Sequence, residues 1–221
     1  MRSAVVALVP VKALDKAKSR LGTHLSPVER SALARHMIHD VLSVLSAVPR
    51  LVTMVVTSDA VAKQIAAQFD LATITDQGSG ESVVVEHATR HLVAQRAVGS
   101  LVIPGDVPLL TAEEVEQVLA DGTGNRCVLV PSRSGRGTNA VLRMPPDLID
   151  LEFGNDSFIP HLEKARRTQV HWTVLRLSGL GLDIDELDDL NELLRCPAAT
   201  RTHAFLADSG IADRLSVHEP V

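Results

Sequence analysis

Aromatic and cysteine residues are scarce in this chain of 221 residues. It has no tyrosine, one tryptophan, four phenylalanines and two cysteines. So few aromatic side chains argue against a base-stacking surface of the kind that binds single-stranded nucleic acid. Cys127 and Cys196 lie far apart in the sequence and form no CxxC pair. This argues against a disulfide framework or a zinc ribbon and is typical of a protein from the reducing cytoplasm.

Strong positive charge and long apolar runs are missing as well. The formal net charge is −5 and the pI is about 6.0, so long-range attraction of nucleic acid is not expected. The apolar run at residues 4–11 is too short for a membrane span and lacks a cleavage site, so we interpret it as a buried strand. The hydrophobic share of 45% suffices for one α/β domain over residues 1–221, with a C-terminal tail from about residue 197.

Two catalytic signatures are also absent from the sequence. Without a GxxxxGK[ST] motif, a P-loop NTPase is not indicated. Without a GxSxG elbow, a serine hydrolase is not indicated either.

Short β-branched runs alternate with amphipathic stretches along the chain. Strands are predicted at residues 4–11, 51–58, 71–76, 100–110, 126–132, 138–144 and 170–177. Helices are predicted at residues 27–48, 60–69, 82–97, 112–120, 158–167 and 185–195, although the valines at the start of 82–97 would also suit a strand. Capping boxes are expected at Ser26 with Glu29 and at Thr111 with Glu114, and an N-cap at Asp59. This alternation predicts βαβ units on a largely parallel sheet that is covered on both faces.

A basic segment follows the first predicted strand. It contains Lys12, Lys16, Lys18 and Arg20. Ligands of open parallel sheets bind beyond the carboxyl ends of the strands, so these cations could clamp a polyphosphate. From charge alone, an ordinary solvated loop explains them equally well.

Carboxylates follow two other apolar runs. Asp106 comes after the strand that breaks at Pro104, where it could hold Mg²⁺ or cap a turn. Asp183 and Asp185 alternate along an extended segment and could share a metal ion with Asp106, although acidic turns before helices are common. Cations, carboxylates and a metal ion together indicate nucleotidyl or phosphoryl transfer.

Five segments in this order resemble the guanylyltransferases of coenzyme F-420 biosynthesis. They are VPVKALDKAKSRL, IPGDVPLLT, GRGTNAVLRMPP, FGNDSFIPHLEKA and GLDIDELDDL, and the similarity extends from about Val9 to Leu194. Members of that family join GTP to 2-phospho-L-lactate, phosphoenolpyruvate or 3-phospho-D-glycerate. The resemblance implies one Rossmann-like, GT-A-like nucleotidyltransferase domain that requires GTP and Mg²⁺ and releases pyrophosphate.

The resemblance also implies roles for individual residues. The metal ligands would be Asp106, Asp183 and Asp185, and the catalytic residues Asp106, Lys12, Lys18 and Arg20. The nucleotide would be bound by Pro10, Lys12, Lys18, Arg20, Asp76, Gly78, Gly80, Glu81 and Ser82. The phosphorylated acid would be held by Thr138, Gly154 and Ser157, the last at a helix start, where free N–H groups favour an anion.

One motif departs from the family pattern. The family has Leu-Asn where this chain has Glu81 and Ser82. A serine hydroxyl cannot fully copy an asparagine amide toward a purine edge, whereas Glu81 could accept hydrogen bonds from N1–H and the amine of guanine.

We therefore expect a cytoplasmic guanylyltransferase that acts on GTP and a small phosphorylated carboxylic acid, without nucleic acid or membrane partners. A homo-oligomer, and contact with a downstream transferase that uses the product, are compatible with this function. The alternatives are a related nucleotidyltransferase with another base or acceptor, a GT-A sugar transferase, and a relative that binds nucleotide without turnover.

Overall fold

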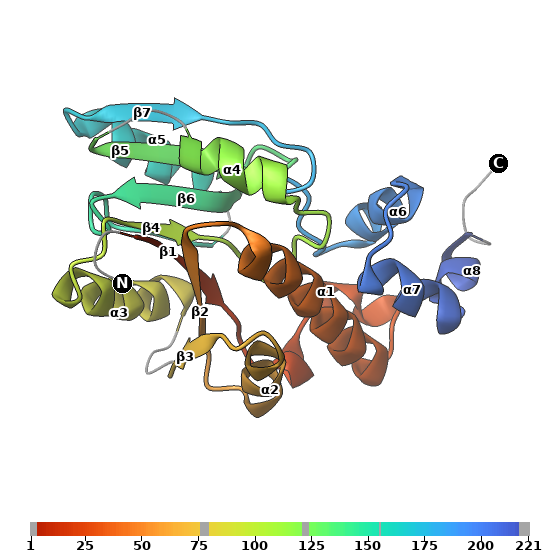
Figure 1. Cartoon of the computed structure of the whole chain (residues 1–221). Helices are drawn as coiled ribbons and strands as arrows, with labels where there is room; N and C mark the ends of the chain where they lie inside the picture. The colour runs from red at the N-terminus through yellow and green to blue at the C-terminus, as the bar shows by residue number, and fades with distance from the viewer. Residues whose placement is uncertain (1–3, 76–79, 121–123, 155, 217–221) are drawn as a thin grey trace.

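The computed structural model describes residues 4–75, 80–120, 124–154 and 156–216, and a seven-stranded sheet forms its centre (Figure 1). The strands are β1 (Val5–Pro10), β2 (Leu51–Val56), β3 (Ala72–Ile74), β4 (Gly99–Val102), β5 (Arg126–Pro131), β6 (Thr138–Met144) and β7 (His171–Val174). Their order is β3-β2-β1-β4-β6-β5-β7. Only β6 runs antiparallel to its neighbours among these strands, which confirms the predicted mostly parallel α/β sheet.

Helices cover both faces of this sheet. They are α1 (Pro27–Ala47), α2 (Ala60–Gln68), α3 (Glu81–Ala94), α4 (Ala112–Ala120), α5 (Phe158–Arg167), α6 (Leu187–Arg195), α7 (Arg201–Asp208) and α8 (Ile211–Ser216). One core packs α1, α2 and α4 against one face of the sheet and extends to the three C-terminal helices, of which α7 packs on α1 and α8 on α7. The other core packs α3 and α5 against the opposite face. Successive strand residues alternate between the two cores, Leu8 facing α3 and Val9 facing α1. No helix of the described residues is long and apolar enough to cross a membrane.

Local sequence signals set several helix starts. Ser26 and Glu29 form both halves of the predicted capping box, and the carboxylate of Asp59 accepts hydrogen bonds from the N–H groups of Val61 and Ala62. The valine-rich segment is helical, as α3, because Val84 and Val85 pack into a core together with Ala88 and Leu92, at helical spacing.

The second predicted capping box is only half formed. The N–H of Glu114 donates to Thr111 Oγ1 at 3.2 Å. The buried Glu114 carboxylate instead accepts hydrogen bonds from the N–H groups of Gly179 and Leu180, both at 2.8 Å. The carboxylate of Glu114 therefore binds the N–H groups of a distant loop and does not bind the N–H of Thr111, as a full capping box would require.

The segment expected to be a tail is folded onto α1. The Asp40 carboxylate, inside α1, accepts hydrogen bonds from the N–H groups of Arg201 and Thr202 at 2.9 Å each and so caps α7. Arg214 Nη2 lies 2.7 Å from Glu29 Oε1, which ties α8 to the start of α1. The segment named as a C-terminal tail therefore contains two helices that the sequence did not predict, α7 and α8.

The topology brings several chain segments to one edge of the sheet. The parallel strands end there, and β6 begins there because it runs the other way. From β1 the chain first adds β2 and β3 on one side of the sheet and then places β4 on the other side of β1. The strand order therefore reverses between β1 and β4. Ligand sites of open α/β sheets form at such a point.

Candidate active site

A cleft of about 620 Å³ opens at this reversal point. Its walls come from the end of β1 and the loop after it, from α1, from the start of α3 and from the loop after β4. Seven of the predicted site residues line it: Pro10, Lys12, Lys18, Gly80, Glu81, Asp106 and Asp185. This volume is in the range of small-ligand sites.

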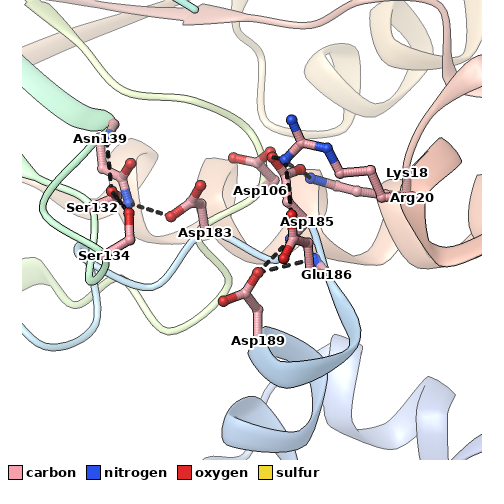
Figure 2. Close-up of polar contacts among 11 residues, drawn as sticks. Lys18, Arg20, Asp106, Ser132, Ser134, Asn139, Asp183, Asp185, Glu186 and Asp189 are labelled. Atoms are coloured by element: carbon pink, nitrogen blue, oxygen red, sulfur yellow. Dashed lines mark hydrogen bonds and ion pairs between the residues drawn. The ribbon is translucent and has the colours of Figure 1, made fainter. Parts of the chain in front are cut away.

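Lys18 lies at the centre of an acidic group beside the cleft. Two 3-10 turns, η1 (Leu14–Lys16) and η2 (Ser19–Thr23), flank it, and its φ of 53° is in the left-handed region. Its ammonium lies 2.5 Å from Asp106 Oδ2 and 2.9 Å from Asp185 Oδ1 (Figure 2). Burial alone would lower the pKa of Lys18, but the two carboxylates outweigh it and raise that pKa. The lysine is therefore charged.

The other predicted cations are more exposed. Arg20 Nη1 lies 3.4 Å from Asp185 Oδ2, and its side chain is half exposed. Lys12 Nζ lies 3.3 Å from Glu81 Oε2 with 70% of its side chain exposed. Such pairs are weakly held, so both side chains can turn toward a ligand in the cleft.

The three predicted metal carboxylates have different partners. Asp106 Oδ1 is buried without a hydrogen-bond partner among the described residues. Burial raises the pKa of Asp183, which accepts a hydrogen bond from Asn139 Nδ2 at 3.0 Å. Burial would also raise the pKa of Asp185, but Lys18 outweighs it and lowers that pKa. Within the described ranges, no three potential ligands are grouped closely enough to hold a metal ion, so the shared metal site stays a prediction.

The loop that carries Asp183 and Asp185 is fixed by residues to which the sequence assigned no role in the site. Glu114 holds its Gly179–Leu180 turn, and Asn139 Nδ2 donates to the carbonyl of Leu180 at 3.1 Å. A Cβ on Gly179 would overlap the carbonyl oxygen of Leu109, so only glycine fits this close approach. The late helix starts at Leu187, two residues after its predicted start, which leaves Asp185 extended.

Two of the nine residues predicted to bind the nucleotide, Asp76 and Gly78, lie outside the described residues. Gly80 has a φ of 105° just before α3, and Glu81 faces the cleft, where burial raises the pKa of its carboxyl group. Ser82 Oγ accepts a hydrogen bond from the N–H of Phe153 at 2.8 Å. The structure therefore brings Ser82 to the loop of Gly154 and does not place it among the cleft-lining residues.

The residues predicted to hold the phosphorylated acid form a second, neutral cluster. Ser157 Oγ donates to Thr138 Oγ1 at 3.1 Å, and both residues are buried. Gly154, with a φ of 143°, lies in the loop before α5. Ser157 stands at the start of α5 as predicted, but the N–H of Phe158 already donates to the carbonyl of Arg136 and Pro160 has none. The helix start thus offers an anion fewer donors than expected.

Known proteins match almost the whole chain. The sequence model of the family described as guanylyl transferase CofC like matches residues 5–218. Phosphoenolpyruvate guanylyltransferase of Rubrobacter xylanophilus is 34% identical over 86% of this chain and 93% of its own. The enzyme of the same name from Roseiflexus castenholzii is 38% identical over 88% and 90%. The 2-phospho-L-lactate guanylyltransferase of Methanocaldococcus vulcanius is 27% identical over 94% and 92%.

Solved structures share the fold. A Desulfovibrio desulfuricans protein, provisionally described as a nucleotide-diphospho-sugar transferase, has a TM-score of 0.78 at 22% identity, with 99% of this chain and 100% of that chain covered. A nucleotidyl transferase from Methanothermobacter has a TM-score of 0.62 at 11% identity, with 93% and 99% covered. The fold is thus that of nucleotidyltransferases, and the chain belongs to the CofC-like guanylyltransferase family.

Proposed function

We propose that this guanylyltransferase joins the GMP part of GTP to the phosphate of phosphoenolpyruvate and releases pyrophosphate. The observation that carries the proposal is Lys18, held between Asp106 and Asp185 beside the cleft at the strand reversal. This arrangement combines fixed negative and positive charge where a nucleotide triphosphate would enter. Phosphoenolpyruvate is the preferred acceptor because relatives with that name reach 34% and 38% identity, against 27% for the 2-phospho-L-lactate enzyme.

The cleft supplies the nucleotide side of this reaction. The exposed side chains of Lys12 and Arg20 would neutralise charge on the triphosphate, and pyrophosphate leaves more readily when that charge is offset. Glu81 faces the same cleft and can accept from the N1–H and amine of guanine. Its proximity to Lys12, at 3.3 Å, couples recognition of the base to the cation that would meet the phosphates.

We infer that the carboxylates of Asp106, Asp183 and Asp185 bind a hard divalent cation. Asp106 Oδ1 has no partner in the described structure, and Asp106 with Asp185 already holds a cation, the ammonium of Lys18. Asp183 is near enough to Asp106 and Asp185 for their charges to raise its pKa, after burial. Mg²⁺ held by these three carboxylates would neutralise and align the reacting phosphates. Until it binds, Lys18 offsets the charge of this carboxylate group.

The acceptor needs no strong base from the protein, because its phosphate is already ionised at neutral pH. Catalysis then depends on holding that phosphate in line with the α-phosphorus of GTP and on charge compensation. Thr138, Gly154 and Ser157 are the residues we assign to holding the acid. They lie at the same edge of the sheet as Asp106 because β6 begins where β4 ends.

The test is a panel of four nucleoside triphosphates against phosphoenolpyruvate, 2-phospho-L-lactate and 3-phospho-D-glycerate, with Mg²⁺, read as pyrophosphate release. The proposal expects the largest kcat/KM for GTP with phosphoenolpyruvate. A preference for CTP, or for another acceptor, would replace that assignment within the same class of reaction. Tight GTP binding with no pyrophosphate from any pair would instead identify a non-catalytic relative.

A further inference from the structure

His161 is a buried residue of the neutral cluster to which the sequence assigned no role. It lies on the first turn of α5, its side chain is 0% exposed, and it contacts both of the segments predicted to hold the phosphorylated acid. Its Nδ1 lies 3.0 Å from Thr138 Oγ1, and its Nε2 accepts a hydrogen bond from the N–H of Glu152 at 2.8 Å.

These two contacts determine which ring nitrogen carries the proton. A backbone N–H can only donate, so Nε2 must present its lone pair to Glu152. The proton of the neutral ring is then on Nδ1, which donates to Thr138 Oγ1. Burial, and next the charges of Lys164 and Arg143, lower the pKa of His161 to about 4, so the ring is neutral near pH 7.

The direction of the Thr138 hydroxyl follows from this tautomer. Thr138 Oγ1 accepts from His161 Nδ1 and from Ser157 Oγ, which fills both of its lone pairs. Its own proton can therefore only point away from these two residues, and no described residue accepts it. A hydroxyl fixed in this way can donate to a phosphate or carboxylate oxygen and cannot accept from a ligand donor.

The same histidine fixes the loop before α5. Three successive N–H groups donate to three side chains: Leu151 to Glu86 at 3.0 Å, Glu152 to His161 at 2.8 Å and Phe153 to Ser82 at 2.8 Å. Gly154 follows directly. The backbone at Gly154 is thus anchored before any ligand binds, which reduces the entropy lost on binding.

We propose that His161 is the positioning residue of the acceptor subsite: its Nδ1–H makes the Thr138 hydroxyl a fixed donor to the phosphorylated acid, and its Nε2 holds the loop of Gly154. The inference rests on the proposed function for the identity of the acid. It adds the residue that orients the donor. It also predicts that the subsite binds an anion, whose oxygens accept a hydrogen bond from Thr138, more tightly than a neutral alcohol of similar size.

Substitutions can separate the two contacts. In His161→Gln the amide reaches the former Nε2 position and can still accept from Glu152, but it loses the donor to Thr138. His161→Asn does the reverse. We expect His161→Gln to raise the KM for phosphoenolpyruvate about tenfold, the value of one hydrogen bond, and to leave the KM for GTP within about twofold. His91→Gln, an exposed histidine of α3, is the matched control.

A double-mutant cycle distinguishes positioning from general support of the fold. Thr138→Val removes the hydroxyl, so adding His161→Gln to it should change the KM for phosphoenolpyruvate by less than about twofold. Additive effects, or an unchanged KM in His161→Gln, would overturn the inference while leaving the guanylyltransferase function intact.

Long-range ¹⁵N–¹H NMR of the wild-type protein tests the same contacts without a variant. We expect a neutral Nδ1–H tautomer for His161 at pH 7, and a shift of that proton when phosphoenolpyruvate and the α,β-methylene analogue of GTP bind. A neutral Nε2–H tautomer, or no shift at saturation, would refute the inference. If the wild-type protein turns over no phosphorylated acid, the proposed function fails, and the tautomer still reports separately on the geometry.

Discussion

The two ends of the candidate site are built on different physical principles. The nucleotide end is a partly exposed group of charges, in which Lys18 balances Asp106 and Asp185. The acceptor end is a buried network of neutral groups around His161, with both ring nitrogens bonded. Charged groups can exchange an internal cation for an external one, whereas the neutral network is already ordered before a ligand arrives and leaves the Thr138 hydroxyl proton to donate. The difference suggests that the metal ion and the nucleotide rearrange the charged end, whereas the phosphorylated acid binds to a neutral end that is already in place.

The strongest test of the charged end is Asp106→Asn. The amide keeps the size of the side chain but removes the charge that pairs with Lys18, and it leaves one oxygen in place of the two that now face Lys18 and a potential cation. We expect turnover to fall about 10³-fold, because several kcal/mol of phosphate charge stabilisation are lost. Pyrophosphate release measures this, and Asp208→Asn, an exposed aspartate of α7, is the control. Turnover close to wild type would remove Asp106 from the mechanism.

The neutral end should make the stability of the protein depend on pH in the acid range. The folded-state pKa of His161, about 4, lies below the ordinary value of 6.5. As the pH falls below about 6.5 the unfolded chain therefore takes up this proton first, and the stabilisation present at higher pH is lost toward pH 4. Lys164 and Arg143 favour the neutral ring, and the nearby Glu152 opposes them.

The expected loss is about 3 kcal/mol between pH 7 and pH 4. It is measured as the difference in the free energy of unfolding between the wild-type protein and His161→Gln, which lacks the titrating ring. Parallel pH profiles for the two proteins would show that the imidazole is not held neutral.

A third prediction concerns Glu114, which fixes the loop of Asp183 and Asp185 at the charged end. Glu114→Gln places an amide NH₂ where one of two backbone N–H groups needs an acceptor. We expect the free energy of unfolding to fall by about 2 kcal/mol, the penalty of a buried unpaired donor. Urea unfolding of this variant and of Glu113→Gln, its exposed neighbour, measures the difference. Equal stability of the two would show that the loop has another anchor.

Local sequence signals predicted what depends on near neighbours. The Ser26 capping box, the Asp59 cap and the order of strands and helices as far as α6 are all fixed within a few residues or by hydrophobic period, and all are observed. The position of Asp106 after a buried strand was predicted for the same reason. A parallel sheet then brings the strand ends together, whatever lies between them.

Polar contacts between residues far apart in the chain could not be predicted from the sequence. Glu114 fits a capping box and binds a turn 65 residues away instead. Asp40 lies within α1 and caps α7, whose first residue is 161 positions further along the chain. This is why α7 was not predicted. His161 and Asn139 gave no pattern of their own, because their roles follow from which buried N–H, carbonyl or hydroxyl group needs a partner. Such needs exist only after the chain has folded.

The last and smallest effect concerns Lys18 as an internal counterion. In the wild-type protein an added divalent cation must compete with an ammonium that is 7% exposed and bonded to two carboxylates. Lys18→Met keeps most of the aliphatic stem and removes that competitor. Mg²⁺ without nucleotide should therefore stabilise the variant more than the wild type, by about 1 kcal/mol at ten times its Kd.

Thermal unfolding with MgCl₂, against NaCl of equal ionic strength, measures this difference. Lys16→Met, an exposed lysine of the same loop, is the matched control and should respond as the wild type does. Equal Mg²⁺ stabilisation of Lys18→Met and wild type would mean that the ammonium does not occupy the place of the metal ion. The charged end would then be as preformed as the neutral one, because its carboxylates would bind a cation without first giving one up.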